Sequence, residues 1–407
     1  MPKPKIYFHT SYIGNGGYNN HAQNLIHELQ KLAPLKVRNF SISPKTWEGM
    51  NDEPHNGESY LTDLDKKLLI NQALWNGEGS GKKLVDHAMY TNYPNEFNHN
   101  INIILNECNH HFYHSLYDGP KIGYLVWEST RMDENFFKLW NTFDQLWVAS
   151  KWQKECAIEQ GADPKKVKVV PEAVDGNLFK PDPKIKLPDF DDGRFKFMHF
   201  GRWDYRKSTR ELVEAFLDEF DSDEPVDLIL SIDNFYAKDG LKNTEERLKK
   251  YGLDDPRLKI LHFPSREDYV KYLQSGDVFL SCARSEGWNL PLIEAMACGT
   301  PSIYSNCSGQ LEFAEGLGLP VKISHMEPAQ RGEYSSFHRH LIRGEFYEPD
   351  FKDLRKVMRD AYENYSEHKK RALKESEIIR TKFTWENAAK IAYNTANEFL
   401  TTLPDNK

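Results

Sequence analysis

Two glutamates separated by seven residues, Glu286 and Glu294, form the most specific chemical pattern in this chain. They lie in the segment Ser281–Pro301, which begins at the end of an apolar run typical of a strand. Leu290–Ala297 predicts a helix, and the start of a helix presents free N–H groups that bind anions. Carboxylates beside such a helix start suit a sugar nucleotide, because acids accept hydrogen bonds from hydroxyls and amides bind phosphates. The alternative is a capping carboxylate followed by an unrelated surface glutamate.

A second pattern places two cations between a predicted strand and a predicted helix, in the segment Phe200–Ser208. Arg202 offers a planar fork of donors for phosphate oxygens, and Lys207 supplies a mobile point charge. Gly201 allows close backbone approach. Together these residues would neutralise a diphosphate and stabilise it as a leaving group. The alternative, a solvated basic helix start, is disfavoured because cations at a helix N-terminus need an anion.

A third pattern is the glycine pair Gly16 and Gly17, between the predicted strand Lys5–Thr10 and the predicted helix Asn19–Leu32. Glycines there let backbone N–H groups approach an anion. The spacing differs from the G-x-G-x-x-G dinucleotide fingerprint. We therefore consider either a phosphate or sugar loop or an ordinary turn from strand to helix.

The elements that must position these residues form two alternating series of apolar strands and amphipathic helices. Continuous apolar strands indicate parallel sheets covered by helices on both faces. In such sheets ligands bind at the carboxyl ends of the strands, where all three patterns lie. The strands are expected at Lys5–Thr10, Lys36–Ile42, Ile101–Glu107, Lys121–Glu128, Gln145–Ser150 and Val167–Val170, then at Phe195–Phe200, Val226–Ile232, Leu258–Phe263, Asp277–Ala283 and Thr300–Tyr304. The helices of the second series are expected at Lys207–Phe220, Arg266–Ser275, Leu290–Ala297 and Leu354–Tyr365, before a last helix at Trp385–Leu400.

A stretch rich in Pro, Gly and Asp between the two series is the expected linker, and 407 residues suffice for two domains. We expect an α/β protein with two Rossmann-like doubly wound domains facing a cleft. The expected bounds are 1–180 for the N-terminal domain, 181–194 for the linker and 195–384 for the C-terminal domain. Residues 43–100 are polar and match no element that we can assign.

Segment Ser281–Pro301 resembles the E-x7-E motif of family-4 retaining glycosyltransferases of the GT-B fold, which use nucleotide sugars. Phe200–Ser208 is similar to that family's G-R-x-x-x-x-K segment, and Val169–Pro181 to its hinge-proximal segment. Ser308–Glu312 is similar to a turn that follows the next strand in the family, and Phe383–Trp385 to the start of its terminal helix. The resemblance implies that residues 385–407 return to the N-terminal, acceptor-side domain, and that the C-terminal domain binds the nucleotide sugar.

The same resemblance implies roles for individual residues. Arg202 and Lys207 would bind the donor diphosphate and, with Glu286 on the transferred sugar, form the catalytic set. Glu294 would hold the ribose. Further donor contacts are implied for Gly16, Gly17, Gly201, Gly287, Trp288, Asn289 and Leu290.

The chain departs from the family at the end of the fourth N-terminal strand, where the family often carries a histidine. Here the segment ends in Trp127 and Glu128. Trp127 could stack on a sugar and Glu128 could position an acceptor hydroxyl, with Tyr18 as a further contact. The alternative is a core tryptophan and a capping glutamate.

Aromatic residues make up 13% of the chain, and six of them fall beside the loops of these motifs. Large aromatic side chains suit sites that stack flat or sugar-like ligands. The six candidates that could line the cleft are Tyr12, Tyr18, Trp127, Trp203, Tyr205 and Trp288. The alternative is that the aromatic residues are ordinary core and surface residues.

Charge and cysteine content restrict the class of protein. The net charge of −8 argues against a generic nucleic-acid binder. Five cysteines without a C-x-x-C pattern favour a reducing compartment, so we expect a cytoplasmic protein. The sequence has neither a signal-like apolar region near Met1 nor an apolar window long enough to span a membrane, which leaves peripheral membrane contact open.

Two sequence patterns contain metal-binding residue types but lack the spacing of a specific metal site. His110 and His114 have helical spacing but lack an H-E-x-x-H motif, and Asp63 and Asp65 form a common D-x-D triplet. We expect no metal and no cofactor besides the nucleotide-diphosphate sugar that serves as donor.

The resulting hypothesis is a metal-independent hexosyl or pentosyl transferase with retention of configuration. The acceptor hydroxyl, on a glycan, lipid, protein, small molecule or modified DNA base, is not identified by the sequence. The alternatives are a nucleotide-sugar epimerase, a transferase acting on modified DNA bases and a non-catalytic sugar-nucleotide binding protein.

Overall fold

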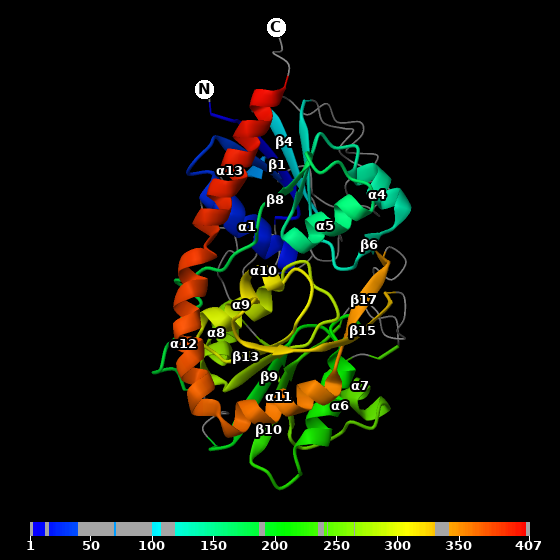
Figure 1. Cartoon of the computed structure of the whole chain (residues 1–407). Helices are drawn as coiled ribbons and strands as arrows, with labels where there is room; N and C mark the ends of the chain where they lie inside the picture. The colour runs from blue at the N-terminus through cyan, green and yellow to red at the C-terminus, as the bar shows by residue number, and fades with distance from the viewer. Residues whose placement is uncertain are drawn as a thin grey trace.

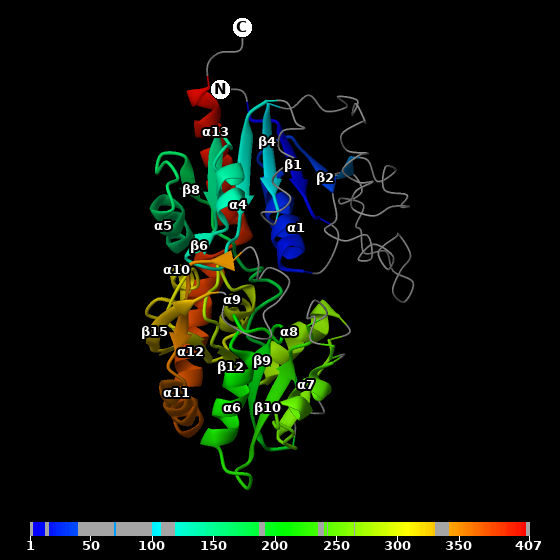
Figure 2. The ribbon, with the colours of Figure 1, turned by 90° about the vertical axis from the view of Figure 1, so that its right-hand side faces the viewer.

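The structure is a computed structural model that describes residues 3–12, 16–39, 69–70, 100–106, 119–186, 192–234, 240–241, 243–263, 265–329 and 342–403. Two parallel sheets lie one above the other along the molecule (Figures 1 and 2). In the part that is described, the sheet of the N-terminal half has the order β3 (Leu69–Ile70), β2 (Leu35–Asn39), β1 (Ile6–Thr10), β4 (Ile101–Leu105), β5 (Lys121–Leu125), β7 (Gln145–Val148) and β8 (Val167–Val169).

The described strands of the first sheet all pair in parallel, and the central strands β4 and β5 are buried on both faces, as is typical of parallel sheets. All five residues of β4 are buried, as are four of the five in β5. The described residues of this half form the helices α1 (Gly17–Leu29), α4 (Glu134–Trp140) and α5 (Lys151–Glu159). Strand order runs outward from β1 in both directions, which is the doubly wound arrangement.

The second sheet repeats this design with the order β11 (Leu258–Ile260), β10 (Val226–Ser231), β9 (Phe195–Phe200), β12 (Val278–Ser281), β13 (Ser302–Ser305) and β14 (Leu319–Val321). Apolar cores lie on its two faces, one around Phe197 and Leu230 and the other around Phe279 and Ile293. Its helices include α6 (Thr209–Glu219), α7 (Thr244–Lys250), α8 (Arg266–Ser275), α9 (Leu290–Ala297) and α10 (Leu311–Ala314). The α/β class and the two Rossmann-like domains are thereby confirmed.

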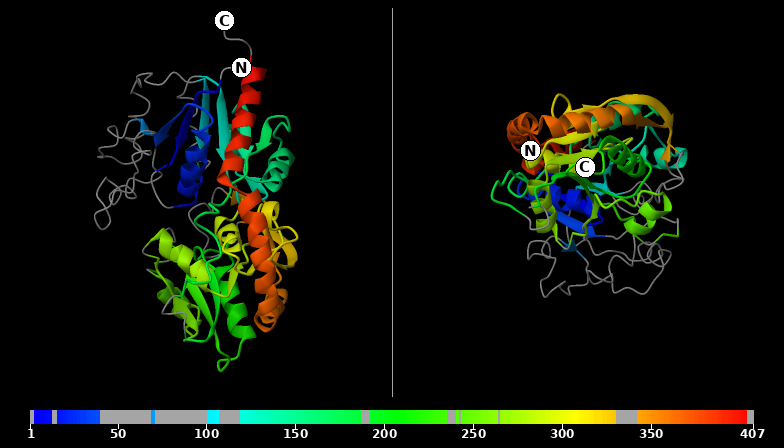
Figure 3. Two further views of the ribbon diagram at one scale, coloured as in Figure 1. Left: turned by 90° about the vertical axis from the view of Figure 1, so that its left-hand side faces the viewer. Right: turned by 90° about the horizontal axis from the view of Figure 1, so that it is seen from below.

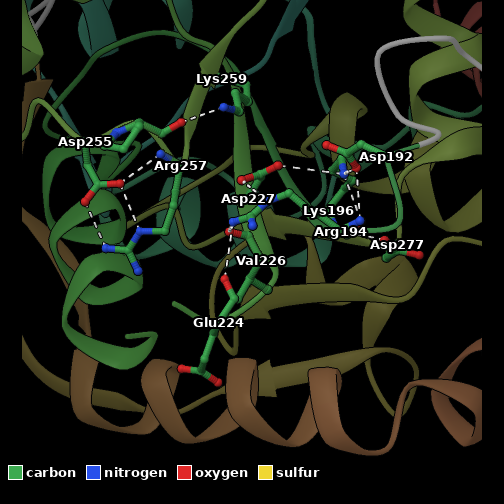
Figure 4. A network of polar contacts seen from close by, with 11 residues as sticks. Asp192, Arg194, Lys196, Glu224, Val226, Asp227, Asp255, Arg257, Lys259 and Asp277 are labelled. Atoms are coloured by element: carbon green, nitrogen blue, oxygen red, sulfur yellow. Dashed lines mark hydrogen bonds and ion pairs between the residues drawn. The ribbon is translucent and has the colours of Figure 1, made fainter. Parts of the chain in front are cut away.

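A network of ion pairs links the first strands of the second sheet to the end of the expected linker (Figure 4). Lys196 in β9 is buried between Asp192 and Asp227, and the Asp227 carboxylate also accepts from Arg194 Nε at 2.9 Å. The backbone N–H of Lys196 donates to Asp277, 2.8 Å away. Buried charges need partners of opposite sign. This network lies at the amino ends of β9 and β10, away from the carboxyl ends of the strands.

Three helices end the chain: α11 (Phe351–Glu363), α12 (Tyr365–Lys382) and α13 (Trp385–Thr402). The α12 and α13 helices follow one another along both halves of the molecule (Figures 1 and 3). The α13 helix packs on α1 and joins the apolar core of the first sheet through Trp385 and Phe399. Thr384, between α12 and α13, forms a parallel β-bridge with Val174. The segment by which the chain leaves the N-terminal half and the segment by which it returns therefore lie side by side.

Three short strands that no sequence pattern predicted follow the second sheet, and one of them pairs with the N-terminal half. Strands β15 (Ile323–Pro328) and β17 (Glu345–Pro349) pair beside the second sheet. Between them, β16 (Ile342–Arg343) pairs with β6 (Arg131–Met132) of the N-terminal half. The C-terminal domain therefore reaches across to the other domain by backbone pairing as well as by α13.

Among the described residues, none of the helices combines the length and the apolar character needed to cross a bilayer. Cys156, Cys282, Cys298 and Cys307 are free thiols.

Candidate active site at the domain boundary

The site lies where the carboxyl ends of β9 and β12 meet the loop after β5. Glu286 follows β12, and Lys207 follows β9. Gly287 touches the N-terminal domain so closely that a Cβ atom there would lie 2.8 Å from the Trp127 carbonyl oxygen. The two domains thus contact each other at the residues that the sequence singled out.

Glu286 is the centre of a buried charge cluster. Its Oε1 accepts from Lys207 Nζ at 2.5 Å and from Arg206 Nη1 at 2.8 Å. Burial opposes ionisation, but the two cations outweigh it and hold the pKa of Glu286 below its ordinary value. Its backbone N–H donates to Ser308 Oγ at 3.0 Å. Glu286 is therefore a fixed, ionised carboxylate that accepts hydrogen bonds.

Arg206 joins this cluster to the N-terminal domain, and no motif in the sequence had marked it. Its Nε lies 3.1 Å from Oε2 of Glu128, which follows β5. The packed surroundings raise the pKa of Glu128, and the charge of Glu286 adds to this, against the opposing effect of Arg206. The structure thus brings Glu128, Lys207 and Glu286 together, as the sequence anticipated for a shared site. The extra cation directly before Lys207 was the available signal for Arg206.

Glu294 lies separately from this cluster, in α9, and both of its carboxylate oxygens have protein partners. Arg266 Nη2 is 3.1 Å from Oε1, and the Tyr269 hydroxyl donates to Oε2 at 2.8 Å. Burial raises the pKa of Glu294 despite the neighbouring Arg266. Arg266 and Tyr269 come from α8, and no sequence motif had marked them. A ribose hydroxyl bound here would join an existing network.

Left-handed backbone conformations mark the loops around the site. Ser208, Asn289 and Ser308 have φ angles of 52°, 88° and 59°. Non-glycine residues adopt this region at a cost that tends to concentrate at functional sites. Ser208 precedes α6 and Asn289 precedes α9, and neither side chain caps its helix. The N–H groups at both helix starts thus have no side-chain cap, and such helix starts bind anions.

The glycines in the motifs are of two kinds: some lie where no side chain would fit, and others lie beside open space. A Cβ at Gly287 would meet Val126 Cγ1 at 2.6 Å, and one at Gly309 would lie 2.0 Å from the Gly287 carbonyl oxygen. Close packing therefore requires glycine at these two positions. At Gly17 and Gly201 no described atom would lie within 4 Å of a Cβ, so both backbones have room for a ligand to approach. Gly16 donates its N–H to Asn19 Oδ1 at 2.9 Å.

Most of the aromatic side chains expected to line a cleft are buried. Tyr12 and Trp203 are 0% exposed and Trp288 is 1% exposed, so stacking of a sugar on these side chains was a wrong expectation. Trp203 instead stacks on Tyr251, and Trp288 packs against Phe313. All three rings belong to the apolar cores of the two domains.

The remaining three aromatic candidates are closer to the surface or the boundary. Trp127, at the boundary, is also buried, with 9% exposure, in the apolar core that contains Phe137 and Trp140. The partly buried Tyr18 donates its hydroxyl to the Val126 carbonyl at 2.9 Å. Tyr205 donates its hydroxyl to Glu327 and lies under the Arg284 guanidinium, 3.8 Å from the ring centre. Contact of Trp127, Glu128 and Tyr18 with an acceptor stays a prediction.

Several patterns fall outside the described residues: His110, His114, Asp63, Asp65, Cys108 and almost all of 43–100. Within the described residues, no three His, Cys, Asp or Glu side chains form a group that could hold a metal ion.

Comparison with known proteins agrees with this architecture. Residues 183–316 match the family model described as Glycosyl transferases group 1. The probable sucrose-phosphate synthase of Thermosipho melanesiensis is 25% identical over 259 residues, which are 59% of this chain and 49% of the relative. One component of the Arabidopsis thaliana phosphatidylinositol N-acetylglucosaminyltransferase is 26% identical over 199 residues, which are 48% of this chain and 41% of the relative. The chain spans less than half the length of the curated relatives that it matches, between 28% and 49%.

Solved structures resemble the whole chain. Sucrose-phosphate synthase from Thermosynechococcus elongatus superposes with a TM-score of 0.68 at 17% identity, covering 98% of this chain and 100% of that one. The Anabaena protein HepE in complex with UDP-glucose gives 0.67 at 17% identity, with the same coverage. At these identities the likeness establishes the fold. The chain therefore has the GT-B fold, and residues 183–316 within it match the glycosyl transferases group 1 model.

Proposed function

We propose that this chain is a retaining glycosyltransferase that moves a hexosyl or pentosyl group from a nucleotide-diphosphate sugar to an acceptor hydroxyl. The observation that carries the proposal is the cluster of Glu286, Lys207, Arg206 and Glu128, which spans the domain boundary. Such an arrangement has Lys207 as a cation for a diphosphate, the ionised carboxylate of Glu286 for sugar hydroxyls and the second carboxylate of Glu128 on the acceptor side. The HepE complex with UDP-glucose makes a UDP-sugar the first donor to test.

In the proposed reaction the bond between the anomeric carbon and the diphosphate oxygen breaks. The acceptor oxygen bonds to the same face of that carbon, and its proton passes to the departing diphosphate oxygen. Arg202 and Lys207, with the N–H groups that begin α6 and α9, stabilise the charge that develops on the diphosphate. No metal is needed for this step, because the protein supplies the positive charge.

The remaining roles follow from position. Glu286 orients the hydroxyls of the transferred sugar, and Glu294 binds the ribose within its network with Arg266 and Tyr269. Backbone groups of Gly201, Gly287 and Leu290 complete the donor contacts, with Gly16 and Gly17 from the other domain. Trp127, Glu128 and Tyr18 face the acceptor.

The test is a panel of nucleotide sugars with UDP, GDP or ADP as carrier, in which release of the nucleoside diphosphate is measured with and without acceptor alcohols. Release that depends on an acceptor, with an α-linked product from an α-linked donor, is the expected result. An isomerised nucleotide sugar in reactions without acceptor would identify an epimerase. Donor binding without turnover on any acceptor would identify a non-catalytic binding protein.

A variant tests the ribose role directly. Glu294→Gln removes the charge but keeps the shape, and we expect about tenfold weaker binding of the nucleoside diphosphate, because a hydrogen bond to a charged group is lost. The control is Glu386→Gln, at an exposed ion pair with Lys390 on α13, which should bind like the wild type. Calorimetry measures both affinities. Equal affinity for wild type and Glu294→Gln would contradict the ribose assignment.

A further inference from the structure

Arg206 is a buried cation whose backbone and side chain are both hydrogen-bonded to the donor domain. Its backbone N–H donates to Asp204 Oδ1 at 2.9 Å, and its carbonyl accepts from the N–H of Arg284 at 2.7 Å. Its Nη1 donates to the Ser285 carbonyl at 2.7 Å. With 5% of its surface exposed, the guanidinium has a fixed position and direction.

The fixed guanidinium points at two carboxylates from opposite domains. Nη1 contacts Glu286 at 2.8 Å, and Nε contacts Glu128 at 3.1 Å. Glu128 keeps 33% of its side chain exposed, so it is accessible to a ligand, whereas Glu286 is 4% exposed. Without a cation between them, the two carboxylates would repel one another.

Arg206 differs in this respect from its neighbour Lys207. Arg206 forms ion pairs with both carboxylates, whereas the ion pair of Lys207 is with Glu286, and the Lys207 side chain is more exposed, at 14% against 5%. An ammonium is a point charge, whereas a guanidinium directs its donors along fixed lines in one plane. Only the planar group can hold two carboxylates at set directions from one another.

We propose that Arg206 is a positioning residue that holds Glu128 of the acceptor-side domain at a set place relative to Glu286 of the donor domain. It thereby fixes where the acceptor hydroxyl meets the donor sugar, and it does not bind the diphosphate. This inference rests on the proposed function and assigns a role to a residue outside the motif pair Arg202 and Lys207.

The experiment compares Arg206→Met, Arg206→Lys and Glu128→Gln with the wild type. The probes are UDP, GDP and ADP for binding by calorimetry, and UDP-glucose, GDP-glucose and ADP-glucose for turnover with water or an alcohol as acceptor. Arg206→Met should lower kcat by about 100-fold, because misplacing reacting groups by about 1 Å costs that much. The affinity for the nucleoside diphosphate should stay within about threefold. The kcat of Arg206→Lys should be about tenfold higher than that of Arg206→Met and still about tenfold below the wild type, since lysine restores the charge but not the planar fork.

Two readouts separate positioning from a merely structural role. Glu128→Gln combined with Arg206→Met should be no slower than the slower single variant, because residues that act as a unit are not additive. The acid limb of the pH–rate profile should move to higher pH in Arg206→Met, because the charge of Arg206, which lowers the pKa of Glu128, is then gone while the charge of Glu286, which raises it, remains. The matched control Arg355→Met removes an arginine from the partly exposed pair with Glu219, and should change neither readout.

Each contrary outcome has a defined meaning. Loss of nucleoside diphosphate affinity in Arg206→Met equal to that in Arg202→Met would overturn the inference, because Arg206 would then be a phosphate ligand. Wild-type kcat in Arg206→Lys would overturn it as well, and so would fully additive losses in the double variant. If Arg206→Met does not fold, Arg206→Lys and Glu128→Gln carry the same test. If the wild type binds none of the three nucleoside diphosphates, the proposed function itself fails.

Discussion

Burial decides the protonation state of one histidine beside the site. This residue is His199 in β9, whose Nδ1 donates to the Leu280 carbonyl at 2.9 Å and whose buried Nε2 has no hydrogen-bond partner among the described residues. Burial lowers the pKa of His199 to about 4, against the hydrogen bond to Leu280, and the charge of Lys207 lowers it further. The folded chain therefore keeps this ring neutral at pH values where an unfolded chain protonates it.

This difference predicts the acid stability of the C-terminal domain. Between the ordinary histidine pKa of about 6.5 and the folded value, the unfolded state binds one more proton, so stability falls as the pH is lowered through this window. The loss at the acid end amounts to about 3 kcal/mol. His199→Asn, which keeps a donor for Leu280, should flatten the dependence of the unfolding free energy on pH between 7 and 4. Urea unfolding at several pH values measures it.

The control for this prediction is His325→Asn, because His325 is exposed on β15. It should retain the slope of the wild type. A His199→Asn slope equal to the wild-type slope would show that other groups cause the acid loss.

At the scale of elements, the sequence predicted those helices and strands that are determined by a local pattern of apolar residues. The helix Leu290–Ala297 and the strand Phe195–Phe200 have the predicted bounds, because an apolar run or a helical apolar spacing fixes each of them locally. The β15–β17 hairpin was not predicted, since three of the six residues of β15 are polar and its pairing partner lies beyond residue 341. Arg206 was missed for the same reason: its partner Glu128 is 78 positions away, on another domain.

The connection formed by β6 and β16 depends on one glycine. Gly344 has φ 74°, and a Cβ there would lie 2.3 Å from Thr130 Oγ1 and 2.8 Å from the backbone nitrogen of Arg131. Next to it, the N–H of Glu345 donates to Thr130 Oγ1 at 2.7 Å, and Arg343 pairs with Asp133 at 3.0 Å. Any side chain at position 344 must push the two domains apart locally.

Gly344→Ala should therefore weaken the interdomain pairing. We expect amide hydrogen exchange in β6 to become at least about tenfold faster, because the local opening free energy falls by about 1.4 kcal/mol or more. Gly316→Ala is a matched control, since Gly316 has φ 76° with no described atom within 4 Å of its Cβ position. It carries the same backbone strain without the clash. Equal exchange in β6 for both variants would mean that the contact between Gly344 and Thr130 does not hold the domains together.

At the scale of the whole molecule, the chain ends by completing the domain with which it began. The core of the first sheet includes Trp385 and Phe399 of α13, packed with residues such as Ile6 and Leu25. Trp385 lies 5.6 Å from the ring of His21, which itself pairs with Glu172 at the exit from the N-terminal domain. The resemblance implied that the terminal helix returns, but the particular partners of α13 depend on packing that no local pattern reveals.

This architecture predicts that a change near the C-terminus destabilises the N-terminal domain. Trp385→Ala removes a large side chain that is 7% exposed, and should lower the stability of that domain by about 3–5 kcal/mol. Ile391→Ala on the same helix removes a side chain that is 39% exposed and serves as the control, with a loss below about 1 kcal/mol. Hydrogen exchange measured by mass spectrometry resolves the two domains. In Trp385→Ala the peptides from β1 and α1 should lose protection, while those from β9 and β10 keep it, because the second sheet has cores of its own. Equal loss in both domains would show that they unfold as one cooperative unit, so that α13 stabilises the molecule as a whole.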